Sequence, residues 1–352
     1  MARHARKMTL QTNLAIPSSG SAIPTRRIGR FSISEKLGKG SNGTVFLGHD
    51  PVIDRDVAIK ILSAATGISD KKQREQQFIN EARAAGRLSH PNIVTIYDAS
   101  TESGTTFIAM EFLQGKDLRE LLASGKRFDI IEIANIISKI AEALAYAHEH
   151  GVIHRDIKPA NIFILPNNQP KVVDFGIARV PNRVLDENGH PAQTLFNNNI
   201  LGTPNYMSRE QALGQQVNAL TDVYSLGAVM YEMLTLKKPF QSNDIDNLLY
   251  QIAHKMPASP SKVNPNIPEK LSYIVMKAMQ KDALARYKNA DEMAQALQKF
   301  LARDKRLKQK KTQLNQGIDP KNISSSKDNS LFWLSCVAII VAIGIVLFSA
   351  GR

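Results

Sequence analysis

A short polar stretch from His154 to Asn161 constrains this chain more than any other feature. It reads His-Arg-Asp-Ile-Lys-Pro-Ala-Asn and places an acid, two cations and an amide within eight residues. Pro159 restricts the backbone, which favours a stiff loop that presents Asp156, Lys158 and Asn161 to one point in space. The aspartate could then accept a hydroxyl proton, the lysine neutralise a phosphoryl oxygen and the asparagine hold a metal ion. Alone, the stretch would fit a polar surface loop equally well.

Three further blocks accompany this loop in a fixed order. Asp174-Phe175-Gly176 begins thirteen residues after Asn161 and offers a second metal carboxylate. Upstream lie a glycine-rich block at residues 38–45 and the block Val57-Ala58-Ile59-Lys60. In this order the four blocks resemble the eukaryotic-type (Hanks-type) serine/threonine protein kinases in their bacterial-like form, from about Phe31 to about Leu301.

The resemblance implies an α+β fold of two lobes and a division of the chain into segments. The N-lobe is expected at residues 31–110, the hinge at 111–115 and the C-lobe at 116–302, so that the kinase domain covers 31–302. The segment 1–30 is expected to be disordered and basic.

The first strands and their glycines support the N-lobe. Residues 31–62 alternate apolar and polar side chains and contain β-branched runs, which predict three strands. A G-x-G-x-x-G pattern also occurs in dinucleotide-binding domains, where a helix follows the glycines. Here Thr44-Val45-Phe46-Leu47 follows and favours a hairpin whose backbone N–H groups lie close over phosphates. An ordinary glycine turn is the alternative.

The resemblance assigns a set of residues to ATP. The hinge backbone would take the adenine edge, and Lys60 would hold the phosphates while paired with a glutamate of the helix predicted over 69–88. Glu81 lies beside the apolar stripe of that helix, Glu75 is a competing candidate, and a solvated surface glutamate is the alternative to both. The full set is Leu37, Gly38, Lys39, Gly40, Ser41, Asn42, Gly43, Thr44, Val45, Ala58, Lys60, Glu81, Met110, Glu111, Leu113 and Phe163.

The resemblance also assigns roles in the C-lobe. Asp156 and Lys158 would be catalytic, and Asn161 and Asp174 would bind Mg²⁺, with Mn²⁺ as an alternative metal. An amphipathic helix over 130–150, ended by Gly151, would hold the catalytic loop rigidly.

A second helix is predicted to begin at Thr221, which would cap it. Asp222 in its first turn would anchor the backbone of the catalytic loop, or would serve as a simple capping acid. Further helices are predicted at 244–254, 269–280 and 290–302.

Residues 177–201 look like the activation segment of such a kinase. Thr194 is the hydroxyl residue within them, and we expect its phosphate to pair with Arg155. Thr203 would bridge the catalytic aspartate and lysine. The chain departs from the family pattern at Arg209, where proline is expected before Glu210, which leaves the rigidity of the substrate platform open. We expect Glu210 to pair with Arg286.

The end of the chain changes in composition. A basic linker is expected at 303–330, and residues 331–350 are twenty residues without a charge. Twenty residues of helix span about 30 Å, the thickness of a bilayer's hydrocarbon core, so we expect a transmembrane helix, with a buried core helix as the alternative. The basic flank predicts a single pass through the plasma (inner) membrane with a cytoplasmic kinase domain.

The distribution of charge points to partners. The net charge is +13, but residues 31–302 hold 30 basic and 29 acidic side chains, so the excess lies on the flanks. Flanking charge fits an anionic lipid surface, and we expect no nucleic-acid partner. The resemblance implies protein substrates with Ser/Thr hydroxyls and allows a homodimer for trans-autophosphorylation.

Two other functions fit parts of the chain. A membrane-tethered nucleotide-binding scaffold without catalysis usually lacks a lysine, base or metal ligand, and none is missing here. A basic adaptor at the membrane surface would carry its function in the tail. Deleting residues 303–352 distinguishes a kinase from such an adaptor, because a kinase would still use ATP and would lose only its membrane location.

Overall fold

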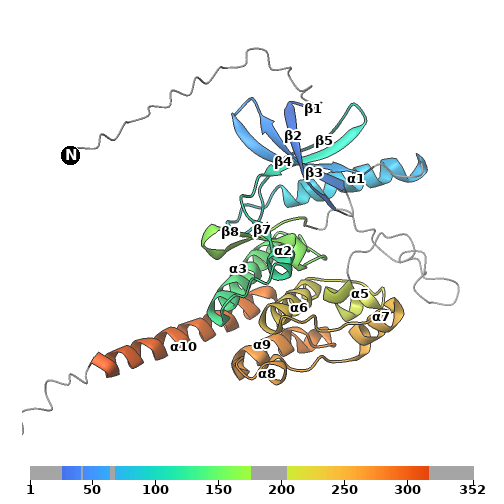
Figure 1. Cartoon of the computed structure of the whole chain (residues 1–352). Helices are drawn as coiled ribbons and strands as arrows, with labels where there is room; N and C mark the ends of the chain where they lie inside the picture. The colour runs from blue at the N-terminus through green and yellow to red at the C-terminus, as the bar shows by residue number, and fades with distance from the viewer. Residues whose placement is uncertain (1–25, 41–42, 64–67, 176–203, 317–352) are drawn as a thin grey trace, which may run out of the picture. The chain divides into compact units, whose positions relative to one another are not determined.

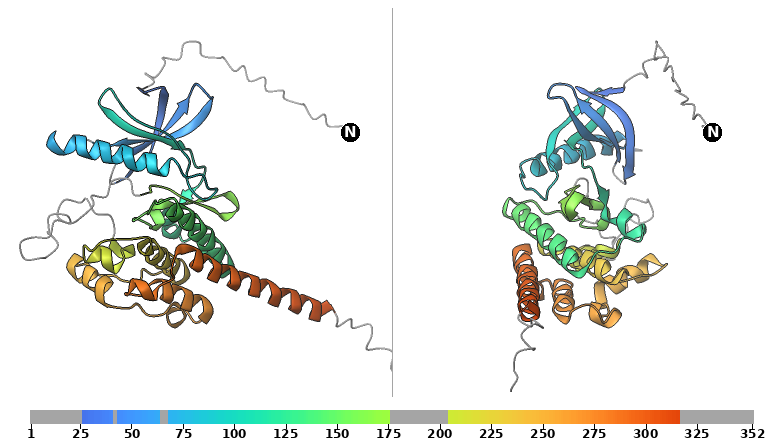
Figure 2. Two further views of the ribbon diagram at one scale, coloured as in Figure 1. Left: turned by 180° about the vertical axis from the view of Figure 1, so that it is seen from behind. Right: turned by 60° about the vertical axis from the view of Figure 1, so that its left-hand side comes forward.

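The computed structural model describes residues 26–40, 43–63, 68–175 and 204–316 (Figure 1). The chain divides into two compact units, Met1–Gln298 and Lys299–Arg352. All elements up to the last helix belong to the first unit, which has a β-rich N-terminal part and a helical C-terminal part (Figure 2).

An antiparallel sheet forms the N-terminal part. In the described residues its strands lie in the order β1-β2-β3-β4-β6-β5. Their bounds are β1 Arg26–Ile28, β2 Phe31–Gly40, β3 Gly43–Asp50, β4 Arg55–Leu62, β5 Ile96–Glu102 and β6 Thr105–Glu111. The three strands predicted over residues 31–62 are confirmed.

Two predictions about this part are corrected. Residues 26–28 lie within the segment expected to be disordered, yet they form β1, because Ile28 is buried and its register places it opposite Phe31. The prediction for residues 1–25 lies outside the described residues. The apolar and β-branched residues 93–97 also predict a strand, but the observed strand begins at Ile96 and runs on to the turn at Ser103.

The two faces of this sheet have different tasks. Val57 and Ile59 of β4 pack with Phe31 and Phe107 on one face. Ala58, the residue between them, packs on the other face against the helix α1 (Ile68–Ala85). Because successive side chains of a strand point to opposite faces, Lys60 lies on the α1 side together with Ala58.

Two long helices organise the C-terminal part. Helix α3 (Ile130–Glu149) begins with a capping box between Asp129 and Glu132 and buries the predicted apolar stripe. It packs against α6 (Leu220–Thr235), of which most residues are buried. The remaining helices are α2 Leu118–Ala123, α5 Arg209–Ala212, α7 Ile245–His254, α8 Pro260–Val263, α9 Glu269–Ala278 and α10 Ala290–Gln316. Of these, α2, α5 and α8 are short and were not predicted.

The predicted cap of α6 is wrong. Thr221 lies inside the helix, is fully buried and donates to Oε1 of Glu210 at 2.7 Å. The N–H of Leu220 is instead accepted by Oδ1 of Asn218 at 2.9 Å. The position of Thr221 is therefore set by a tertiary contact, which a local capping pattern does not reveal.

A small second sheet follows the hinge. Strand β6 ends at Glu111, and residues 112–115 lead into β7 (Lys116–Asp117). Its partners are β8 (Ile162–Leu165) and β9 (Gln169–Val172), in the order β7-β8-β9. Asn161 directly precedes β8, and Asp174 follows two residues after the end of β9.

The last described helix is longer than predicted. α10 was expected to end at residue 302 and runs to Gln316. Its continuation is rich in lysine and arginine, which are good helix formers, and Asp304 pairs with Lys308 at 2.9 Å. No helix within the described residues is long and apolar enough to cross a membrane. The span predicted at 331–350 lies outside them.

Candidate active site

The catalytic loop is held by one carboxylate of α6. Asp222 is fully buried and accepts the backbone N–H groups of His154 and Arg155, each at 2.8 Å. Its Oδ2 also contacts Nε2 of His148 at 2.8 Å. The predicted anchoring role of Asp222 is therefore confirmed, and the alternative of a simple capping acid explains none of these contacts.

His154 joins the loop to the segment that ends in Asp174. Its buried ring places Nε2 at 2.9 Å from the carbonyl oxygen of Val173, and its Nδ1 accepts the N–H of Asp156 at 3.2 Å. Because a carbonyl oxygen can only accept and Nδ1 already accepts an N–H, these two contacts require the proton on Nε2. The ring also packs on Phe175, with centroids 4.7 Å apart. Sequence reasoning gave His154 no role, because its partners are backbone groups distant in sequence.

The predicted catalytic residues lie together. Nζ of Lys158 is 2.7 Å from Oδ2 of Asp156, and Nδ2 of Asn161 donates to the backbone oxygen of Asp156 at 2.8 Å and to its Oδ2 at 3.3 Å. The amide nitrogen of Asn161 is thus committed to Asp156. Its oxygen is the atom that this arrangement leaves for a metal ion.

Lys60 of the N-terminal sheet contacts Asp174, the other predicted metal ligand. Its Nζ lies 2.7 Å from Oδ1 of Asp174, and the lysine side chain is 5% exposed. Asp174 has a φ of 61°, an unusual backbone conformation for a residue that is not glycine. The strand lysine and the second predicted metal carboxylate are therefore brought into direct contact.

One cavity of about 1090 Å³ unites these residues. Most residues that the sequence assigned to a site line it: Leu37, Gly38, Lys39, Gly43, Val45, Ala58, Lys60, Met110, Glu111, Leu113, Asp156, Lys158, Asn161, Phe163 and Asp174. Gly43 must be glycine, because an added Cβ would lie 2.1 Å from the carbonyl oxygen of Ile61. The described parts of β2 and β3 therefore line the cavity through Leu37, Gly38, Lys39, Gly43 and Val45.

The remaining assigned residues divide into two groups. Thr44 of β3 and Arg155 of the catalytic loop are described by the structure but do not line the cavity. The other assigned residues are not described, or only their backbone is: Ser41, Asn42, Thr194 and Thr203 lie outside the described residues, and the structure describes only the backbone of Gly40 and Glu81. Gly40 pairs with Gly43 through the backbone, and Glu81 lies within α1.

Sequence reasoning missed part of the cavity lining. The cavity is also lined by Tyr206, Glu232, Leu236 and Lys238. The Tyr206 hydroxyl donates to Oε2 of Glu232 at 2.5 Å. Burial and the Glu232 carboxylate both raise the pKa of Tyr206, so the phenol stays protonated.

The residues present fit ATP and Mg²⁺. Apolar side chains from both parts cover a space next to the hinge, namely Val45, Ala58 and Phe163. The Asn161 amide oxygen and the Asp174 carboxylate provide hard oxygen ligands of the kind that Mg²⁺ prefers. Lys60 and Lys158 provide positive charge at the same place.

The comparisons with known proteins agree with this geometry. Residues 31–311 match the family model described as protein kinase domain. The chain belongs to the protein kinase family. Its likeness to a solved structure, the kinase domain of Mycobacterium tuberculosis PknI, supports the fold with a TM-score of 0.61 at 24% identity, covering 78% of this chain and 98% of the other.

Curated bacterial kinases share more of the sequence. Serine/threonine-protein kinase PknB of Mycolicibacterium smegmatis is 38% identical over 75% of this chain and 42% of its own length. Serine/threonine-protein kinase PrkC of Bacillus subtilis is 35% identical over 77% of this chain and 40% of its own length. The chain thus spans about two fifths of the length of these relatives.

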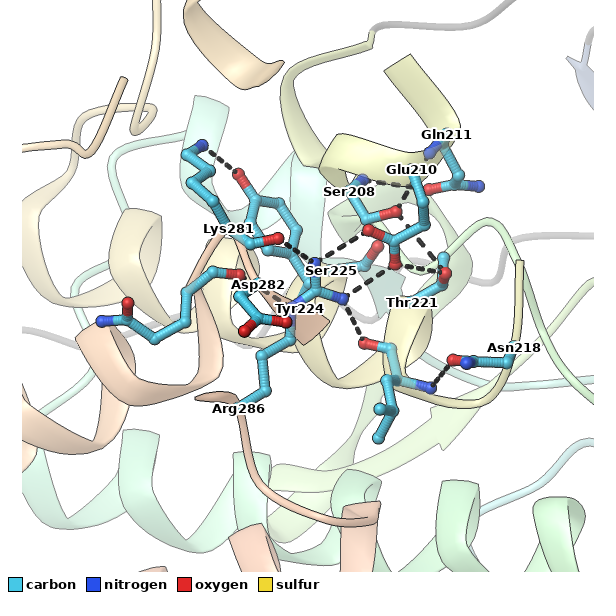
Figure 3. Close-up of polar contacts among 12 residues, drawn as sticks. Ser208, Glu210, Gln211, Asn218, Thr221, Tyr224, Ser225, Lys281, Asp282 and Arg286 are labelled. Carbon is cyan, nitrogen blue, oxygen red and sulfur yellow. Dashed lines mark hydrogen bonds and ion pairs between the residues drawn. The ribbon is translucent and has the colours of Figure 1, made fainter. Parts of the chain in front are cut away.

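The short helix α5 carries the departure from the family pattern. Glu210 forms the predicted ion pair with Arg286, with both guanidinium NH groups at 2.8 Å from its oxygens, and also accepts from Thr221 (Figure 3). Ser208 and Gln211 form a capping box at the start of the helix. These side-chain contacts fix the helix where Arg209 replaces the proline that would otherwise restrict the backbone.

Glu210 makes the stability of this region dependent on pH. Burial alone would raise its pKa, but the hydrogen bonds and charge of Arg286 outweigh burial and lower the pKa from 4.5 to about 2. The carboxylate is therefore ionised in the folded protein at pH values where it is protonated in the unfolded chain. The stability that the pair contributes is present above pH 4.5 and is lost as the pH falls from 4.5 towards 2.

We expect Glu210→Gln to lose this part of the pH dependence. The measurement is the free energy of unfolding by denaturant at several pH values between 2 and 6, on the wild type and on Glu210→Gln. The exposed Glu269→Gln serves as the control that removes an equivalent charge elsewhere. Parallel curves for the wild type and Glu210→Gln would contradict the assignment.

Proposed function

We propose that the chain is a membrane-anchored serine/threonine protein kinase that transfers the γ-phosphoryl group of ATP to protein hydroxyls. One observation carries the proposal: Lys60, Asp156 and Asp174, which come from separate parts of the sequence, line the same cavity. The names of the bacterial relatives and the Ile-Lys-Pro-Ala-Asn wording of the catalytic loop support serine and threonine as acceptors.

The chemistry follows from the positions of the side chains. Phosphoryl transfer needs mainly positioning and charge neutralisation from the protein. Asp156 orients the acceptor hydroxyl and takes its proton as the oxygen attacks phosphorus. Lys158, 2.7 Å from Asp156, lies where it can stabilise negative charge on the transferred group, and Lys60 holds the phosphates that remain on the nucleotide. Bound Mg²⁺, held by Asn161 and Asp174, supplies further charge neutralisation.

The first test removes the base without removing bulk. We expect Asp156→Asn to lower the rate of phosphoryl transfer by about 10²–10⁴-fold, the usual contribution of a positioned base, and to leave ATP binding intact. The full chain is assayed in detergent with labelled ATP, Mg²⁺ and a generic protein acceptor. Asp246→Asn, at an exposed position of α7, is the matched control. A wild type that binds ATP and transfers no phosphate under any condition would leave the nucleotide-binding scaffold as the better function.

Autophosphorylation is proposed for Thr194. A phosphate there would add about 1.5 to 2 negative charges, which Arg155 beside the catalytic aspartate could pair. A homodimer would let one copy act on the other.

We expect mass spectrometry of the active chain to find phosphate on Thr194, and Thr194→Ala to reduce activity. The Asp156→Asn variant, which cannot modify itself, is the negative control. The proposal fails if residues 177–203 carry no phosphate while the threonine variant keeps full activity.

Residues 331–350 are proposed as the anchor, with the basic stretch before them facing anionic lipid. The uncharged run of twenty residues supports this. Since α10 runs to Gln316, a truncation after Gln316 keeps the helix whole, whereas a cut at residue 302 would divide it.

We expect the chain 1–316 to keep ATP-dependent phosphorylation and to move from the membrane fraction to the supernatant after lysis and centrifugation. The chain 1–352 in the same cells is the reference. Recovery of both in the membrane fraction, after a high-salt wash, would contradict anchoring by 331–350.

A further inference from the structure

The side-chain amide of Gln211 joins two parts of the structure. Gln211 is the third residue of α5, and its Oε1 accepts the N–H of Ser208 at 3.1 Å (Figure 3). Its Nε2 donates to the backbone oxygen of Arg155 at 2.8 Å, across 56 residues of sequence. The first contact completes the capping box of α5, and the second leaves the helix for the catalytic loop.

The oxygen that Gln211 reaches belongs to the peptide group between Arg155 and Asp156. The N–H of the same peptide group is the one that His154 accepts on Nδ1. The peptide plane before Asp156 is therefore held at both of its polar ends, by His154 from inside the loop and by Gln211 from α5. A rotation of this plane would move the Cα of Asp156, and with it the carboxylate.

Arg155 needs such support because its backbone is strained. Its φ is 63°, in the left-handed region that costs residues other than glycine roughly 1–2 kcal/mol. Its N–H is held by Asp222 and its carbonyl by Gln211. The two polar groups on either side of the strained residue are thus fixed by side chains from two different helices.

We propose that Gln211 is a positioning residue for the proton acceptor Asp156. It couples the helix that follows the activation segment to the backbone of the catalytic loop. The inference rests on the proposed kinase function. The helix-capping task uses Oε1 and the positioning task uses Nε2, so one substitution can separate them.

Gln211→Glu is that substitution. It keeps the shape and an oxygen for the Ser208 N–H, but it sets a carboxylate oxygen against the Arg155 carbonyl in place of a donor. We expect kcat to fall about tenfold, which corresponds to about 1.4 kcal/mol, with the KM for ATP and the thermal midpoint close to those of the wild type. Gln216→Glu adds the same charge at an exposed position just after the turn that follows α5 and should match the wild type.

A second variant separates positioning from helix stability. Ser208→Ala removes the Oγ that accepts the N–H of Gln211 and leaves the Gln211–Arg155 bond. If Gln211→Glu also lowers the thermal midpoint, equal losses of kcat in the two variants at equal losses of midpoint would overturn the inference, whereas retained kcat in Ser208→Ala would support it. Unchanged kcat in Gln211→Glu would overturn it directly. An inactive wild type would instead contradict the proposed function.

Discussion

The site depends on the hydrogen bonds that the buried carboxylate of Asp222 accepts from the backbone of the catalytic loop. The catalytic loop is irregular, so its backbone N–H groups cannot be satisfied by a helix or sheet and need other acceptors. Asp222 supplies acceptors for two of them from within α6, and the helix itself is held by its packing against α3. Removing those donors would leave a charge buried without compensation, which typically costs several kcal/mol.

Further hydrogen bonds connect the loop that Asp222 holds to the segment ending in Asp174 and to the helix α5. His154 carries the connection to Val173 and so to Asp174, while Gln211 carries it to the helix α5. Lys60 then ties the N-terminal sheet to Asp174. The groups proposed to take the proton, to hold the metal ion and to hold the phosphates are therefore linked by one set of hydrogen bonds and ion pairs, although they come from the catalytic loop, from Asp174 and from Lys60.

Local patterns predicted the parts of the fold that depend on local physics. The apolar stripe of α3 and the alternation in residues 31–62 each follow from the geometry of a single element. The Glu210–Arg286 pair was predicted as well, although opposite charge alone does not single out one partner among the 30 basic side chains of residues 31–302. The roles of His154 and Gln211 were not, since each contacts a backbone oxygen that any residue at that position would offer. The end of α10 was also missed, because its polar continuation has no apolar stripe to mark it.

The alternation of β4 has a consequence for changes in length. A deletion of one residue just before Lys60 would leave the hydrogen bonding of the strand unchanged in kind but would turn the lysine to the opposite face. Its ammonium group would then enter the layer of Phe31 and Phe107, where no carboxylate of the cavity can reach it. Loss of a single codon at this point would therefore remove the lysine ammonium group from the cavity and place a charge in the apolar layer on the other face of β4. A change in the exposed β3–β4 turn would do neither.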